Sequence, residues 1–245
     1  MKEKIRVVVL VVALCLAGSA WMKHDDSKRI SQYESETKKE SQMLTQASAQ
    51  IDGEAAVASK DIKKVAITFD DGPDPIWTEK LLDGLAERNV HATFFVLGKK
   101  VAENEALLKR MQEEGHLIGN HSYNHVQLNR LREAVVKKEL DDTNEQVYEA
   151  TGYRPEYVRP PYGAWDKKKD CPGEMMTVYW TIDTMDWQLL DADKVMKNVV
   201  GKVSDGDIIL LHDVYESSVD AALKIVDYLQ EEGYELVTVD QLILE

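Results

Sequence analysis

Residues 64–73 read KVAITFDDGP, an apolar run that ends in two adjacent carboxylates, a glycine and a proline. A short run rich in β-branched and aromatic side chains is typical of a buried strand, and Asp-Asp-Gly-Pro is a strong turn sequence. The stretch therefore predicts a strand over 64–69 that delivers Asp70 and Asp71 to the point where the chain turns.

Short apolar runs of this kind alternate with segments of helical period through the rest of the chain. We predict strands at 64–69, 93–97, 117–120, 157–159, 177–182, 207–211 and 235–239. We predict helices at 78–88, 104–114, 131–151, 193–203 and 219–232, with Gly115, Gly152 and Gly233 in C-cap positions. The alternation predicts an α/β domain built on a parallel sheet, either open or closed into a barrel.

The composition is that of a globular protein. With 44% hydrophobic and 30% charged residues, the chain is neither disordered throughout nor a polytopic membrane protein. Its formal net charge of −14 argues against nucleic acid as a partner. The two cysteines, Cys15 and Cys171, provide no disulfide framework.

The N-terminal residues have the features of an export signal. Lys2, Lys4 and Arg6 precede a nearly uncharged apolar stretch over 7–22. A cleaved signal peptide and a retained membrane anchor share this pattern, and the stretch is short for a span of about 20 residues, so both alternatives stay open. We expect residues 1–22 to direct the protein out of the cytoplasm, either secreted or anchored to the outer face of the cytoplasmic membrane.

Residues 23–60 differ from the rest of the chain. They are rich in Ser, Gln, Glu and Lys and contain few aliphatic side chains. Such a segment cannot bury enough apolar surface to offset the entropy lost on ordering. We therefore predict a polar tether over 23–60 and a folded domain over 61–245.

Ionisable residues follow the predicted strands at one end. They are Asp70 and Asp71, His121, Arg159, Asp183 and Asp186, and His212. Each could be a solvated turn residue by itself, but parallel strands bring their carboxyl ends to one face, where barrel enzymes carry their chemistry. We expect these side chains to lie together.

His121 and His125 are spaced for metal binding. Two imidazoles four positions apart lie on one face if the chain turns helically after the strand, although histidine pairs also occur on surfaces without a metal. Adjacent residues of an extended strand point in opposite directions, so one of Asp70 and Asp71 can face the ion while the other takes a separate position in the pocket. Two histidines and one carboxylate leave a position open for water, as in catalytic divalent sites.

Five segments of the chain resemble, in order, the motifs of the NodB-homology polysaccharide deacetylases, carbohydrate esterase family four. The segments are Thr68-Phe69-Asp70-Asp71-Gly72, His121-Ser122-x-x-His125, Arg159-Pro160-Pro161-Tyr162-Gly163, Asp183-x-x-Asp186-Trp187 and Leu210-x-His212. The resemblance covers about 61–245 and implies a distorted, incomplete (β/α) barrel.

The resemblance also implies a metal site with a base beside it. Asp71, His121 and His125 look like the ligands of one divalent metal ion, zinc or cobalt. Asp70 looks like the general base that deprotonates water, and Arg159 is expected to pair with it.

The resemblance also implies a general acid and a pocket for the substrate. His212 looks like the general acid, and Asp186 is expected to orient it and stabilise its charge. Tyr162 is expected to offer its backbone N–H to the oxyanion. Trp187 and Leu210 are expected to wall the pocket for the acetyl methyl group, with plain core packing as the alternative for both.

The implied reaction is metal-dependent removal of N-acetyl groups from a GlcNAc-containing polysaccharide such as peptidoglycan, chitooligosaccharide or poly-N-acetylglucosamine. An O-acetyl xylan esterase and a glycan-binding relic without turnover are the alternatives. We expect a monomer whose partner is the acetylated glycan, with residues 7–22 as its membrane tether if they are a retained anchor and not a cleaved signal peptide. The segment 164–176 departs from the family, because a lysine run and a Pro-Gly break stand where a helix is common.

Overall fold

The computed structural model describes residues 62–165 and 175–243. Its strands are β1 (Lys63–Asp70), β2 (Thr93–Val96), β3 (Leu117–Asn120), β4 (Tyr157–Val158), β5 (Met176–Thr177), β6 (Ile182–Asp183), β7 (Ile208–His212) and β8 (Tyr234–Leu236). Its α-helices are α2 (Trp77–Glu87), α3 (Gly98–Val101), α4 (Glu105–Glu113), α5 (Glu133–Thr151), α6 (Asp186–Leu189), α7 (Ala192–Met196), α8 (Glu216–Glu231) and α9 (Val239–Ile243). Two 3₁₀ turns are η1 (Leu128–Arg130) and η2 (Pro161–Gly163).

Some predicted segments lie outside the described residues. These are the signal or anchor over 1–22, the tether over 23–60 and most of the altered segment 164–176. Within the two described ranges, no helix combines the length and the apolar character needed to cross a membrane.

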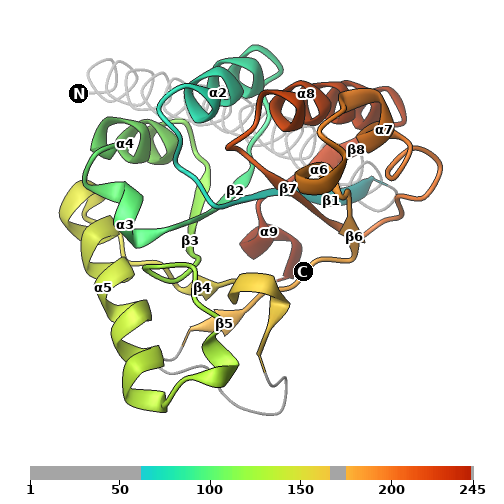
Figure 1. Ribbon diagram of the computed structural model, residues 1–245. Coiled ribbons are helices and arrows are strands. Elements are labelled where there is room, and N and C mark those ends of the chain that lie inside the picture. The colour runs from blue at the N-terminus through green and yellow to red at the C-terminus, as the bar shows by residue number, and fades with distance from the viewer. Residues whose placement is uncertain (1–61, 166–174, 244–245) are drawn as a thin grey trace, which may run out of the picture. The chain divides into compact units, whose positions relative to one another are not determined.

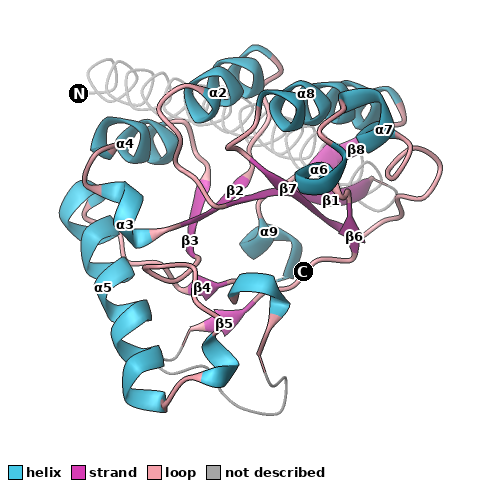
Figure 2. Ribbon diagram, viewed as in Figure 1, coloured by secondary structure: helices cyan, strands magenta, loops and turns pink. Residues whose placement is uncertain are grey.

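The described strands form one parallel sheet. They lie in the order β5-β4-β3-β2-β1-β7-β6, and β8 pairs with the start of β1. The sheet curls, and helices α2, α4, α5 and α8 lie along its outside (Figures 1 and 2). Because β5 and β6 are separate edges, the described strands form a half-barrel, which confirms the distorted, incomplete barrel implied by the resemblance.

The two faces of strand β1 meet different surroundings. Side chains alternate along a strand, so the odd-numbered residues from Val65 to Phe69 pack outward into the main core with α2 and α8. Ala66, Thr68 and Asp70 face the inside of the curled sheet. The last inward position of the strand is therefore a carboxylate, placed at the carboxyl end of the sheet.

Apolar residues fill the inside of the half-barrel near the start of the strands. Ala66, Phe95, Val178 and Val239 form a buried cluster, and Leu242 of α9 packs against it. This packing closes one end of the interior. The polar residues remain at the other end, as in barrels whose interior is a packed core.

The prediction of a single strand over 177–182 is wrong. Its two ends are β5 and β6, which lie at opposite edges of the sheet. The Val178 N–H donates to Val158 O (2.8 Å), whereas the Thr181 N–H donates to Ile208 O (2.9 Å). The residues between them cross the open side of the half-barrel, so one extended run pairs with two different neighbours.

The prediction of a strand over 235–239 is correct only for its first part. β8 ends at Leu236, and α9 begins three residues later. The side-chain oxygen of Gln241 accepts the N–H of Thr238 (3.2 Å). This Thr-x-x-Gln contact is one half of a capping box, so the C-terminal residues turn into a helix.

The remaining helices lie close to their predicted ranges, with one shorter. Helix α7 ends at Met196 rather than near 203, because β-branched residues and then Gly201, with φ of 70°, follow it. The three predicted C-cap glycines, Gly115, Gly152 and Gly233, all have positive φ between 76° and 81°. These caps end α4, α5 and α8 as predicted.

Candidate active site

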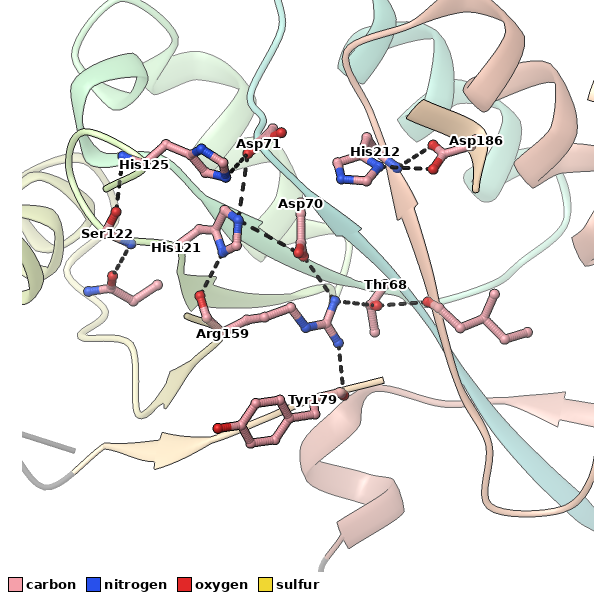
Figure 3. A network of polar contacts seen from close by, with 12 residues as sticks. Thr68, Asp70, Asp71, His121, Ser122, His125, Arg159, Tyr179, Asp186 and His212 are labelled. Carbon is pink, nitrogen blue, oxygen red and sulfur yellow. Dashed lines mark hydrogen bonds and ion pairs between the residues drawn. The ribbon is translucent and has the colours of Figure 1, made fainter. Parts of the chain in front are cut away.

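Four strands bring ionisable residues to the same end of the half-barrel (Figure 3). Asp70 of β1 pairs in register with His212 of β7. Strands β3 and β4 pair at their last residues, so His121 and Arg159, which follow them, are also neighbours. Asp183 does not join them, since its Oδ1 accepts the N–H of Met185 (2.9 Å) in the turn before α6.

Asp71, His121 and His125 form a cluster of possible metal ligands. One ligand atom from each lies within 4.8 Å of the others. Asp71 Oδ1 lies 3.2 Å from His125 Nε2 and 3.6 Å from His121 Nε2. This buried oxygen has no hydrogen-bond partner among the described residues. A carboxylate and two imidazoles are the donor set of a catalytic zinc-type site, so the cluster fits one divalent ion.

A loop, rather than a helical turn, brings the two histidines together. Ser122 and His125 have positive φ, 65° and 60°, and Ser122 Oγ accepts the His125 N–H (3.0 Å). His121 Nδ1 donates to Arg159 O (2.6 Å), because a carbonyl oxygen can only accept, and this leaves Nε2 as the ligand atom. Burial lowers the pKa of His125, against the raising charge of Asp71, which favours the neutral ring that a metal requires.

The two adjacent carboxylates take separate positions in one pocket, but strand alternation is not the cause. β1 ends at Asp70, and Asp71 has φ of 72°, which turns the chain out of the strand. Asp70 Oδ2 and Asp71 Oδ1 lie 3.7 Å and 3.6 Å from His121 Nε2. The left-handed conformation of Asp71 therefore directs its carboxylate toward His121. In an extended strand the same side chain would point to the other face of the sheet.

The side chain of Arg159 holds the Asp70 carboxylate in place. The guanidinium is fully buried, donates to Asp70 Oδ1 (2.9 Å) and Thr68 Oγ1 (2.7 Å), and lies over the ring of Phe95. Burial lowers the pKa of Arg159, and the charge of Asp70 opposes that effect. A buried ion pair of this kind is costly to break, because removing one partner leaves the other charge uncompensated at about 3–5 kcal/mol.

His212 is held in the same way by a buried carboxylate. Asp186 accepts the backbone N–H of His212 (2.8 Å) and the ring Nδ1–H (2.9 Å). Burial lowers the pKa of His212, but the hydrogen bond to Asp186 and the charges of Asp186, Asp70 and Asp71 outweigh it and raise the pKa to about 9. The ring is therefore protonated at neutral pH and can act as an acid.

The three predicted substrate-contacting residues differ in exposure. Tyr162 is 68% exposed and Trp187 is 48% exposed, whereas Leu210 is buried in β7. Tyr162 has φ of 62°, and its ring packs edge-on against His125 with centroids 4.7 Å apart. Trp187 follows Asp186 in helix α6. Two of the three are thus exposed aromatic side chains, and Tyr162 lies beside the ligand cluster.

Asp213 is a buried group at this site that the sequence interpretation missed. Its pKa is raised to about 7 by burial, against a hydrogen bond from Thr78. A Cβ added to Gly72 would lie 2.7 Å from the Asp213 carboxyl carbon, so this motif glycine is required for close approach. The Asp213 side chain thus packs directly against the turn that carries Asp71. No local sequence pattern predicts this contact.

Comparison with known proteins gives the family. A profile of the family described as "Polysaccharide deacetylase" matches residues 58–171. Peptidoglycan-N-acetylglucosamine deacetylase of Bacillus cereus is 38% identical over 73% of this chain and 68% of its own length. Chitooligosaccharide deacetylase of Bradyrhizobium is 32% identical over 74% of this chain and 90% of its own length.

A third relative has a solved structure. Peptidoglycan-N-acetylmuramic acid deacetylase PdaC of Bacillus subtilis is 42% identical over 74% of this chain, which spans 38% of the length of that protein. Its solved structure is similar with a TM-score of 0.73 over 75% of this chain and 91% of the solved chain. Sequence and fold agree over about three quarters of the chain, and the chain belongs to the polysaccharide deacetylase family.

Proposed function

We propose that the domain over 61–245 hydrolyses N-acetyl groups of a GlcNAc-containing polysaccharide in a metal-dependent reaction that releases acetate. One observation carries the proposal: a donor set for a divalent ion lies at the same end of the half-barrel as two anchored groups, Asp70 on Arg159 and His212 on Asp186. Amide hydrolysis needs a base for water and an acid for the departing nitrogen. Asp70 and His212 offer one of each.

Asp71, His121 and His125 would hold the ion, for which zinc and cobalt are our candidates. Three protein ligands leave further positions open. When bound, such an ion lowers the pKa of a water molecule to about 7 and polarises the acetyl carbonyl.

Asp70 is the base in this proposal. Its Oδ2 lies beside the ligand cluster, and its Oδ1 is held by Arg159. The buried guanidinium keeps the carboxylate in place and compensates its charge. Asp70 accordingly accepts the proton of the attacking water without being needed as a ligand.

His212 is the acid, and three further residues position the acetyl group. A ring held protonated by Asp186 donates its proton to the departing amine nitrogen. The backbone N–H of Tyr162 stabilises the oxyanion, an interaction worth about 3–4 kcal/mol in other hydrolases. Trp187 and Leu210 line the pocket for the methyl group.

The names of the relatives support cell-wall and chitin-type glycans as substrates. Two are named for peptidoglycan and one for chitooligosaccharide. N-acetylglucosamine is a unit of both glycans, so we propose it as the sugar that is deacetylated. Because one relative is named for N-acetylmuramic acid, that unit of peptidoglycan is the second candidate.

Acetate release from a panel of glycans tests the function. Metal-free protein is given zinc or cobalt and then chitopentaose, peptidoglycan or acetyl-xylan. We expect acetate from the N-acetylated glycans and only with metal, and mass analysis of digested peptidoglycan assigns the modified sugar. Release from acetyl-xylan alone would identify an esterase, and glycan binding without acetate would identify a relic that has lost turnover.

Replacing Asp186 with asparagine is expected to move the basic limb of the pH–rate profile to lower pH. The hydrogen bond and charge of Asp186 are the largest contributions that raise the pKa of His212 to about 9, and burial opposes them, so removing Asp186 should lower that pKa. The acid form is then lost at lower pH, so we expect a shift of about one pH unit or more. Initial rates of acetate release between about pH 5 and pH 10 measure the shift.

The matched control is Asp193→Asn, which removes a carboxylate from a surface pair with Lys224. This variant should keep the wild-type profile. An unchanged basic limb in active Asp186→Asn protein would mean that another group supplies the proton.

We also propose that the domain works outside the cytoplasmic membrane, since relatives are named for peptidoglycan and the N-terminal residues have the pattern of an export signal. Protease added to intact, wall-stripped cells is expected to digest it while a cytoplasmic marker survives. Full protection of the domain until the cells are lysed would contradict the proposal.

A further inference from the structure

The loop between the two histidines of the ligand cluster has every backbone N–H paired. The His121 N–H donates to Val96 O (2.9 Å) and the Ser122 N–H to the Asn120 side chain (2.8 Å). The His125 N–H donates to Ser122 Oγ (3.0 Å). Two donors remain in the middle of the loop, and their acceptor lies 15 and 16 residues further along the chain.

That acceptor is the carboxylate of Glu139 on helix α5. Its Oε2 accepts the N–H of Tyr123 (3.1 Å) and the N–H of Asn124 (2.8 Å). Its Oε1 accepts the side-chain Nδ2–H of Asn124 (2.8 Å). One side chain therefore makes three hydrogen bonds to two consecutive residues, and charged acceptors make the stronger bonds of this kind.

The opposite side of the loop is held by helix α3. The Gly98 N–H donates to Ser122 O (3.1 Å) and the Lys99 N–H to Tyr123 O (3.2 Å). A Cβ on Gly98 would lie 2.5 Å from the Tyr123 ring, so the contact is close. Helix α3 thus donates hydrogen bonds to the backbone carbonyls of the loop, and Glu139 accepts them from its backbone amides.

These hydrogen bonds matter because the loop backbone is strained. Ser122 and His125 both have φ near 60°, a left-handed conformation that costs free energy for residues other than glycine. Such conformations persist only when surrounding contacts hold them. His125 Nε2 lies 3.2 Å from Asp71 in this conformation, so a relaxed loop would separate the ligand atoms.

We propose that Glu139 is a positioning residue for the metal site: it holds the loop 121–125 in the strained conformation that presents His125 beside Asp71 and His121. The inference rests on the proposed metal-dependent function. Glu139 acts through the loop and touches neither the ion nor the substrate. Its loss should therefore weaken metal affinity, while activity at saturating metal should fall much less.

Zinc affinity of four variants tests the proposal, measured by competition with a chromogenic chelator on purified, metal-free protein. We expect Glu139→Ala to bind zinc about tenfold or more weakly than wild type. Glu139→Gln keeps one acceptor oxygen for the two amides, and its amide can pair with a flipped Asn124, so we expect less than about a threefold loss. Asn124→Ala removes only the side-chain bond and should also lose little.

Asp141→Ala is the control on the same helix, because Asp141 makes an exposed pair with Lys137 away from the loop. It should bind zinc as wild type does. Hydrogen exchange of metal-free protein should be faster at residues 121–127 in Glu139→Ala than in this control, which reports loop order independently of metal.

Several results would overturn the proposal. One is a wild-type zinc affinity in Glu139→Ala. Another is an equal loss of zinc affinity in the alanine and glutamine variants, which would indicate an effect of charge. A third is unchanged hydrogen exchange in the loop. A wild-type chain that binds no zinc would overturn both this inference and metal dependence. Zinc binding that depends on Glu139 without acetate release would overturn the proposed function alone.

Discussion

Asp70→Asn is expected to bind about one metal ion per chain and to release acetate about 10²-fold or more slowly than wild type. The substitution keeps Asp71, His121 and His125 but removes the carboxylate that takes the proton from water, and general-base removal typically costs this much. Added metal should not restore the rate. Metal analysis of the purified variant, with acetate release at increasing zinc, measures both quantities.

Stability must be followed in the same variant. Arg159 is fully buried and loses its anionic partner, although the asparagine oxygen still accepts one hydrogen bond. We expect a free energy of unfolding lower by about 3 kcal/mol, the small end of the range for a broken buried pair. Asp220→Asn, which disrupts only a surface pair with Lys80, is the control. An active Asp70→Asn protein would remove Asp70 from the role of base.

Asp71→Asn is expected to fail for the opposite reason, through loss of metal. The substitution replaces the charged member of the ligand cluster, whose Oδ1 lies between the two imidazoles. Changes in groups that merely support ligands cost about 10–100-fold in metal affinity, so we expect at least about a 10²-fold loss for a ligand itself. Excess zinc or cobalt should partly restore acetate release.

The pair of variants separates the two adjacent carboxylates. Zinc titration followed by chelator competition gives affinity, and acetate release at each metal concentration gives activity. If both variants lose metal equally, the carboxylates share the role of ligand and the division proposed for them is wrong. If Asp71→Asn keeps full affinity, the ion is held by a different set of residues.

Local patterns predicted most of the residues that meet, but they wrongly included Asp183 and missed Asp213. Asp70, His121 and His212 each end or follow a predicted strand. A parallel sheet brings the carboxyl ends of its strands together, whatever the distance between them in sequence. The run 177–182 shows the limit of this reasoning. Its periodicity indicates an extended chain, but only the available neighbours decide that its two ends pair at opposite edges of the sheet.

The sequence by itself determined the α/β class, the five motifs and most of the residues that gather at the carboxyl end of the strands, since these depend on periodicity and on turn chemistry within short segments. Tertiary structure alone decided how they are held. The φ of 72° at Asp71 and the grip of Glu139 on the loop between the histidines have no local signature. The same is true of the contact between Gly72 and Asp213. The contacts of Glu139 and Asp213 each depend on a side chain of one element meeting the backbone of another, and that geometry exists only once the sheet and its helices have packed.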